Sequence, residues 1–180
     1  GPFSQRLANM MELVWPGGRL NVAEVEVPAQ TLVKIRLLEE VNSGNARVDQ
    51  LVPYRVASDV MVDGRLVLPA GTEGKARVVK VEAAGSLGRS GRVELDFGVV
   101  RAIDGTDVRM NVDERAAEQN AQAAAAAASV AGAVLLGPIG LVSGYFVRGQ
   151  DHVIPAGSEF YVEVVNPVKV HGLSLVPVTE

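Results

Sequence analysis

The stretch Pro69-Ala70-Gly71-Thr72, followed by the alternating segment 74–81, contains the pattern that decides the fold. The same pattern, Pro-Ala-x-Thr/Ser before alternating apolar residues, occurs again at 28–31 and at 155–158. Proline fixes φ and suits a turn, glycine tolerates positive φ, and alternating β-branched residues suit a half-buried strand. The chain is therefore predicted to be a β-protein built from recurring turn-and-strand units. The turn positions are Pro28, Pro69, Gly71, Pro155 and Gly157.

Most of the chain between residues 19 and 113 has the same β character, and it returns after residue 149. Asp63-Gly64 and Asp104-Gly105 each separate two apolar segments, which is typical of hairpins. We therefore expect a mainly β domain at 19–180, an antiparallel β-barrel or sandwich with a helical insertion at 114–148. Alternation places these residues in its core: Ile35, Leu37, Val67, Val79, Leu95, Val162 and Val164.

The first eighteen residues form a separate unit in this interpretation. Gly1-Pro2 resembles the remnant of a cleaved affinity tag. Residues 3–15 have apolar side chains at helical spacing, which predicts a short amphipathic N-terminal helix that Pro16 ends. Such a helix either docks on the β-domain or links it to an upstream domain.

Residues 114–148 interrupt the β pattern. No charged residue occurs from Gln119 to Val147, and six consecutive alanines at 123–128 favour helix. Because Pro138 lacks a backbone donor, we expect a helix over 114–136, a break at Gly137-Pro138 and a second helical piece over 139–147. The resulting Ala/Gly-rich hairpin has apolar residues that need cover from the barrel, from other protomers or from lipid. These candidates for assembly or membrane contact are Leu135, Leu136, Ile139, Leu141, Val142 and Phe146.

Composition argues against several classes of function. The net charge is −4 and no basic patch is visible, so we expect no nucleic-acid partner. Aromatic residues make up only 4%, which leaves few platforms for stacking bases or sugars. The absence of cysteine excludes disulfides and thiolate chemistry. We expect no cofactor.

Few residues are candidates for chemistry. His152 and His171 have no acidic partner at ligand spacing, so we expect no metal site. Glu94 and Asp96 share one strand face, and paired carboxylates can perform acid–base catalysis. With Arg92 beside them, such residues more often form a solvated face. We therefore expect no catalytic residue and no enzymatic activity.

The order of these motifs resembles the C-terminal β-barrel of TrbI-like proteins, the outer-membrane-complex scaffold subunits of type IV secretion systems. The resemblance covers about residues 27–166 and rests on segments 31–43, 52–60, 65–74, 92–97, 102–105 and 153–158. The resemblance implies a shared barrel architecture. It also implies that 114–148 lies where the family has a helical antenna that reaches the outer membrane.

Three functional hypotheses remain open at this point. The leading one is a non-enzymatic scaffold domain of the bacterial periplasm or outer membrane, which forms a homo-oligomer, binds other envelope proteins and can contact the membrane through 119–147. The alternative is a soluble β-barrel binding module for a peptide or glycan, with the insertion packed on its own barrel. The third is a hydrolase using Glu94 and Asp96. An exposed insertion favours the first hypothesis, and a buried insertion favours the second.

Overall fold

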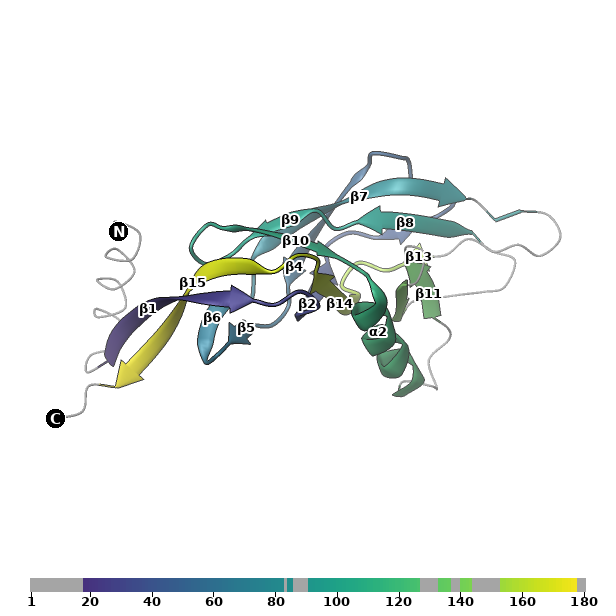
Figure 1. Ribbon diagram of the computed structural model, residues 1–180. Helices are drawn as coiled ribbons and strands as arrows, with labels where there is room; N and C mark the ends of the chain where they lie inside the picture. Colours follow the sequence, from purple (N-terminus) through teal and green to yellow (C-terminus); the bar gives the residue numbers. More distant parts are fainter. Residues whose placement is uncertain are drawn as a thin grey trace.

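The computed structural model describes residues 18–82, 84–85, 91–126, 133–136, 140–143 and 153–177. The prediction of a mainly β, predominantly antiparallel fold is confirmed, and one short helix, α2 (Glu114–Ala126), is present among the described residues (Figure 1). The strands are β1 (Gly18–Val27), β2 (Leu32–Leu37), β3 (Val41–Asn42), β4 (Leu51–Val56), β5 (Val60–Val62), β6 (Arg65–Leu68), β7 (Glu73–Glu82), β8 (Arg92–Asp96), β9 (Val99–Arg101), β10 (Asp107–Asn111), β11 (Ala133–Leu136), β12 (Gly140–Ser143), β13 (Val153–Ile154), β14 (Glu159–Val164) and β15 (Val168–Pro177).

The larger sheet has nine strands in the order β12-β11-β8-β7-β4-β2-β14-β10-β9. Only Phe97 and Gly98 separate β8 from β9 in the chain, although these strands are six places apart in the sheet. The sheet must therefore curl until β8 approaches the β9–β10 hairpin, and it forms a half-barrel around the core. A four-stranded sheet, β1-β15-β6-β5, and the β3–β13 pair complete the fold.

The core prediction is largely confirmed. Six of the seven expected residues are buried, and Val79 is the exception with 37% exposure. Ala76 and Val78 of β7 point inward, so the adjacent Val79 points outward. The register between β7 and β8 then shifts after Val78, which leaves Val79 unpaired at a bulge. The sequence contains two adjacent valines, and the pairing with β8 decides which one is buried.

The three Pro-Ala units adopt the same turn. In each unit the last residue donates its backbone N–H (3.2–3.3 Å) and its hydroxyl (2.7 Å) to the proline carbonyl. The third residue has positive φ: 70° at Gln30, 91° at Gly71 and 86° at Gly157. This is the geometry of a type II turn. The three turns lead into β2, β7 and β14, all strands of the nine-stranded sheet.

The prediction of a helical hairpin at 114–148 is confirmed for its first helix over 114–126 and wrong for the other described residues of the insertion. The described helix covers Glu114–Ala126, and residues 133–136 and 140–143 are the strands β11 and β12, which pair with each other. At Leu136↔Val93, β11 also joins the edge of β8, the one parallel contact among the described strands. A short apolar segment can form helix or strand, and here the free edge of β8 supplies backbone partners. The N-terminal helix expected at 3–15 lies outside the described residues.

Candidate functional site

A charged groove crosses the outer face of β14, β2 and β4. Along β2, Val33, Ile35 and Leu37 are buried, so Lys34 and Arg36 point away from the core. The same alternation turns Arg55 of β4 outward. Segments far apart in the sequence thus place basic side chains on one surface.

The strand register aligns four charged residues in one row across this face. Glu159 of β14 is opposite Arg36, Arg36 is opposite Arg55, and Arg55 is opposite Glu73 of β7. Nε and Nη2 of Arg36 donate to Glu159 Oε2 at 3.0 and 2.9 Å, and Arg55 Nη2 donates to Glu73 Oε1 at 3.3 Å. The second oxygen of Glu159 lies 3.7 Å from Lys34 Nζ. Two arginines are therefore direct neighbours, and each is paired with a glutamate on its far side.

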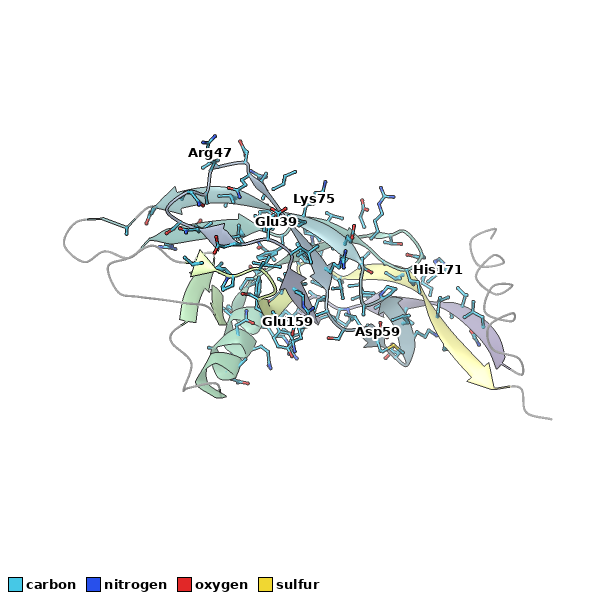
Figure 2. The ribbon with its side chains drawn as sticks, turned by 180° about the vertical axis from the view of Figure 1, so that it is seen from behind. Glu39, Arg47, Asp59, Lys75, Glu159 and His171 are labelled. Carbon is cyan, nitrogen blue, oxygen red and sulfur yellow. The ribbon has the colours of Figure 1, made fainter. Side chains whose placement is uncertain are left out.

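Two hollows extend along the row and meet at Glu159, which Figure 2 shows between α2 and Asp59. The first, of about 280 Å³, lies beside α2 and is lined by Lys34, Gln119 and Tyr161 among others. The second, of about 210 Å³, lies between the two arginines and the turn at 69–72. We call the surface formed by both hollows and their charged row the outer groove.

Helix α2 forms one wall of the outer groove because two buried polar side chains fix it to β14. Glu163 accepts the backbone N–H of Ala116 in the first turn of the helix at 2.9 Å, where the helix dipole favours a negative charge. Asn120 donates to the Tyr161 carbonyl (2.9 Å) and accepts the Tyr161 N–H (2.7 Å). The described helix therefore packs on its own barrel.

The turn at 69–72 forms the opposite wall. Asp59 accepts the Ala70 N–H at 2.7 Å, and the Gly71 N–H bonds to the Val56 carbonyl at 2.8 Å. The Thr72 N–H bonds to the Pro69 carbonyl at 3.2 Å. The amides of this turn are therefore occupied within the protein, and the ligand donors available at this end of the groove are the guanidinium groups.

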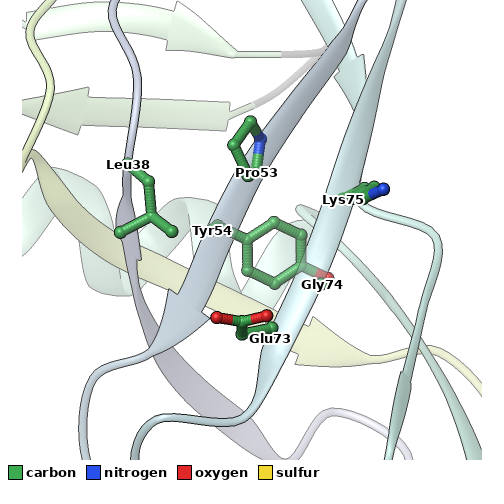
Figure 3. Close-up of a pocket in the computed structure, with 6 residues that line it drawn as sticks. All are labelled: Leu38, Pro53, Tyr54, Glu73, Gly74 and Lys75. Carbon is green, nitrogen blue, oxygen red and sulfur yellow. The ribbon is translucent and has the colours of Figure 1, made fainter.

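A further hollow of about 160 Å³ lies where Tyr54 packs against Gly74. It is lined by Leu38, Pro53 and Gly74 among others, and the ring of Tyr54 lies across it (Figure 3). The Tyr54 hydroxyl donates to the Phe97 carbonyl at 2.6 Å, and burial raises the pKa of this phenol well above its usual range. A Cβ on Gly74 would lie 2.5 Å from the Tyr54 ring. The missing side chain at Gly74 thus leaves room for the tyrosine ring, which lines the hollow.

Glu94 and Asp96, the pair considered for catalysis, are both bound to arginines. Arg92 Nη2 donates to Glu94 at 3.1 Å, and Arg109 of β10 makes two bonds to Asp96 at 2.7 and 3.0 Å. The hydrogen bond from Arg109 holds the pKa of Asp96 below its ordinary value and raises the pKa of Arg109, although partial burial opposes both shifts. Asp96 therefore stays ionised near neutrality, as a bridge between β8 and β10.

His171 contacts a carboxylate that sequence spacing did not reveal. Asp104 accepts the His171 backbone N–H at 2.8 Å, and the imidazole Nδ1 lies 3.4 Å away. Burial raises the pKa of Asp104, but hydrogen bonds from His171 and Thr106 outweigh it and hold the pKa below its ordinary value. Within the described ranges, no group of three His, Asp or Glu residues is placed to bind a metal ion. His152 lies outside those ranges.

The residues predicted for assembly or membrane contact are only partly placed. Leu135 and Leu136 lie in β11 opposite Leu141 and Gly140, and Val142 lies in β12 opposite Val134. Ile139 and Phe146 lie outside the described residues. No helix in the described part of the chain is long and apolar enough to cross a membrane.

Sequence reasoning missed the outer groove. Alternation in segments 32–37 and 51–56 already indicated that Lys34, Arg36 and Arg55 share an outward orientation. The register that sets Arg36 opposite Arg55 was not accessible without the strand order.

Comparison with known proteins gives a likeness to a solved structure and no family. No protein-family model matches the chain. No curated protein matches it. Among solved structures, it is similar to ComB10 of the Com type IV secretion system of Helicobacter pylori, with a TM-score of 0.43 and 11% sequence identity. The match covers 79% of this chain and 88% of that chain.

Proposed function

We propose that this chain is a non-enzymatic scaffold domain of the bacterial cell envelope, in the periplasm or outer membrane. In this proposal it assembles into a homo-oligomer and binds other envelope proteins. The order of its strand and turn motifs, which resembles that of TrbI-like barrels, supports the proposal from the sequence side.

The observation that carries the proposal is the long ribbon formed by β1 and β15. These strands pair over ten consecutive positions, from Gly18↔Pro177 to Val27↔Val168, and Figure 1 shows the ribbon extending away from the half-barrel. Within the described residues, β1 has a strand neighbour only on its β15 side. An unpaired strand edge is a template for pairing with another chain. The ribbon therefore suits contact between subunits.

The absence of enzymatic activity is part of the proposal. Glu94 and Asp96 are each committed to an arginine, which suits ion pairs between strands better than proton transfer. We expect Glu94→Ala and Asp96→Ala to leave the function of the protein largely intact. A measured turnover that either substitution abolishes would contradict this part of the proposal.

A second candidate function is a soluble β-barrel binding module that recognises a peptide or glycan. The packing of α2 on β14 through Glu163 and Asn120 favours it, because this hypothesis needs the insertion on its own barrel. The two candidates differ in oligomeric state, since a binding module can act as a monomer.

Sedimentation velocity over a range of concentrations tests the scaffold proposal. We expect a concentration-dependent oligomer, and we expect Leu20→Lys to weaken it because a lysine on the ribbon discourages strand pairing. Leu51→Lys is the matched control, because Leu51 is 51% exposed on β4, in the half-barrel.

A monomer at all concentrations would contradict the scaffold proposal and leave the binding module. Equal effects of Leu20→Lys and Leu51→Lys would show that the ribbon is not the contact surface. Membrane contact through 119–147 stays a prediction, which flotation with vesicles of bacterial lipids tests. Cell fractionation tests the location in the envelope.

A further inference from the structure

In the row Glu159–Arg36–Arg55–Glu73, two positive side chains lie next to each other, which lowers the stability of the folded sheet. Like charges directly opposite each other on neighbouring strands destabilise a sheet. Arg36 and Arg55 occupy such a pair, and their side chains are 57% and 53% exposed. The opposing glutamates compensate from the outer sides of the row, and no described carboxylate forms an ion pair with both arginines.

Both guanidinium groups retain donors for a ligand. A guanidinium has five N–H donors in a planar fork that matches a carboxylate. Arg36 uses two of its nitrogens and Arg55 uses one in bonds to the glutamates. The remaining donors lie beside the hollow of about 210 Å³, whose other lining includes Ala57, Ala70 and Gly71. These small residues leave space above the arginines.

The charged row of the outer groove, taken with Lys34, differs in sign from the protein as a whole. The row and Lys34 comprise three cations and two carboxylates, whereas the whole chain has a net charge of −4. A local positive surface on an acidic protein favours an acidic ligand. Phosphate is commonly bound with the help of free backbone amides, but the amides of the 69–72 turn are already bonded within the protein.

We propose that the outer groove binds an extended acidic segment of a partner protein, with a Glu or Asp carboxylate of that segment seated between Arg36 and Arg55. The proposal rests on the proposed function and names the chemistry of the partner that the scaffold holds. A carboxylate at this position offsets the repulsion between the two arginines. A second acidic residue of the segment can reach Lys34 at the α2 end of the groove.

Fluorescence polarisation with the full chain and fluorescein-labelled hexaglutamate at low salt tests the proposal. We expect saturable binding and at least about a tenfold loss of affinity in Arg36→Gln/Arg55→Gln, because two charge-assisted contacts are removed. The matched control is Arg47→Gln/Arg101→Gln, which removes the same charge from two exposed arginines without ion pairs to described residues. Figure 2 shows Arg47 well away from Glu159. Arg55→Lys keeps the charge without the fork, and we expect an intermediate loss.

Equal losses in the two double variants would overturn the proposal, because binding would then follow net charge alone. Absence of binding to the wild-type chain would overturn it as well. If inorganic phosphate displaces the probe as readily as free hexaglutamate does, the groove is a phosphate site instead. If the chain floats with phosphatidylglycerol vesicles but not with phosphatidylcholine vesicles, and this flotation depends on Arg36 and Arg55, the groove is a lipid site instead. A thermal melt that is unchanged in the variants verifies that they fold.

The two proposals fail separately. If hexaglutamate does not bind while Leu20→Lys still weakens the oligomer, the groove inference is wrong and the scaffold proposal stands. If the chain is monomeric but hexaglutamate binds through Arg36 and Arg55, the scaffold proposal fails and the groove belongs to a binding module.

Discussion

Asn120 of α2 takes the place of a strand neighbour beside Tyr161 of β14, with one amide that both donates to and accepts from the Tyr161 backbone. Strand β10 pairs with β14 only at Met110↔Val164 and Asn111↔Glu163, and the chain then leaves the sheet to form the helix. The buried amide continues the hydrogen bonding of that edge. The same contact positions one wall of the outer groove.

Replacing Asn120 should therefore loosen the helix. Asn120→Ala leaves the Tyr161 N–H and carbonyl without their partner, and we expect a loss of about 2–4 kcal/mol in the free energy of unfolding. Urea denaturation measures the loss, and hydrogen exchange should show weaker protection of residues 114–126. The control is Gln122→Ala at an exposed position of the same helix. If both substitutions have the same small effect, the amide does not anchor α2.

The bridge between Asp96 and Arg109 should make stability depend on pH. Because the pKa of Asp96 is lowered in the folded state, its contribution is present above the unfolded value of about 3.9 and is lost as pH falls through the folded value. We expect Asp96→Asn to cost roughly 1–2 kcal/mol at neutral pH. The difference from wild type should shrink below about pH 4. A difference that stays constant down to acidic pH in urea titrations would contradict the ionised bridge.

Gly74 should not tolerate a side chain. A Cβ there would lie 2.6 Å from the Tyr54 hydroxyl and 2.8 Å from Val100 Cγ1, so Gly74→Ala overpacks the core. We expect a loss of about 1–3 kcal/mol in chemical denaturation. Gly105→Ala is a useful comparison, because a Cβ at Gly105 meets open space but the backbone φ is +88°. The loss in the free energy of unfolding for Gly105→Ala should come from the positive φ alone and amount to about 1 kcal/mol. A neutral Gly74→Ala would show that the tyrosine ring can move aside.

The three equivalent turns allow a reciprocal exchange. Gln30 has φ of 70°, whereas Gly157 occupies the matching position with φ of 86°. We expect Gln30→Gly to raise stability by up to about 1 kcal/mol, because it relieves left-handed strain, partly offset by the greater entropy of the unfolded chain. Gly157→Gln should lower stability by a similar amount. Thermal melts of the two variants measure both effects, and shifts of the same sign would refute the equivalence of the turns.

Local sequence determined the strands and the turns that lead into them. The alternation of Val33, Ile35 and Leu37 with Lys34 and Arg36 has the two-residue period of a strand, and it defines two faces without knowledge of any neighbour. Proline and a glycine that tolerates positive φ likewise specify the turns at 69–72 and 155–158 within four residues, and Gln30 adopts the same conformation in the third turn. These features depend on sterics between adjacent residues, so they can be read directly from the chain.

Tertiary structure decided which strands are neighbours and what the insertion became. Arg36 meets Glu159, 123 residues away, only because β2 and β14 pair in that register. The segment 133–143 contains short apolar stretches whose length permits helix or strand, and the available edge of β8 makes β11 a strand. Backbone hydrogen bonds between strands need a partner that local sequence does not specify, and the outer groove exists only where such pairings bring distant charges together.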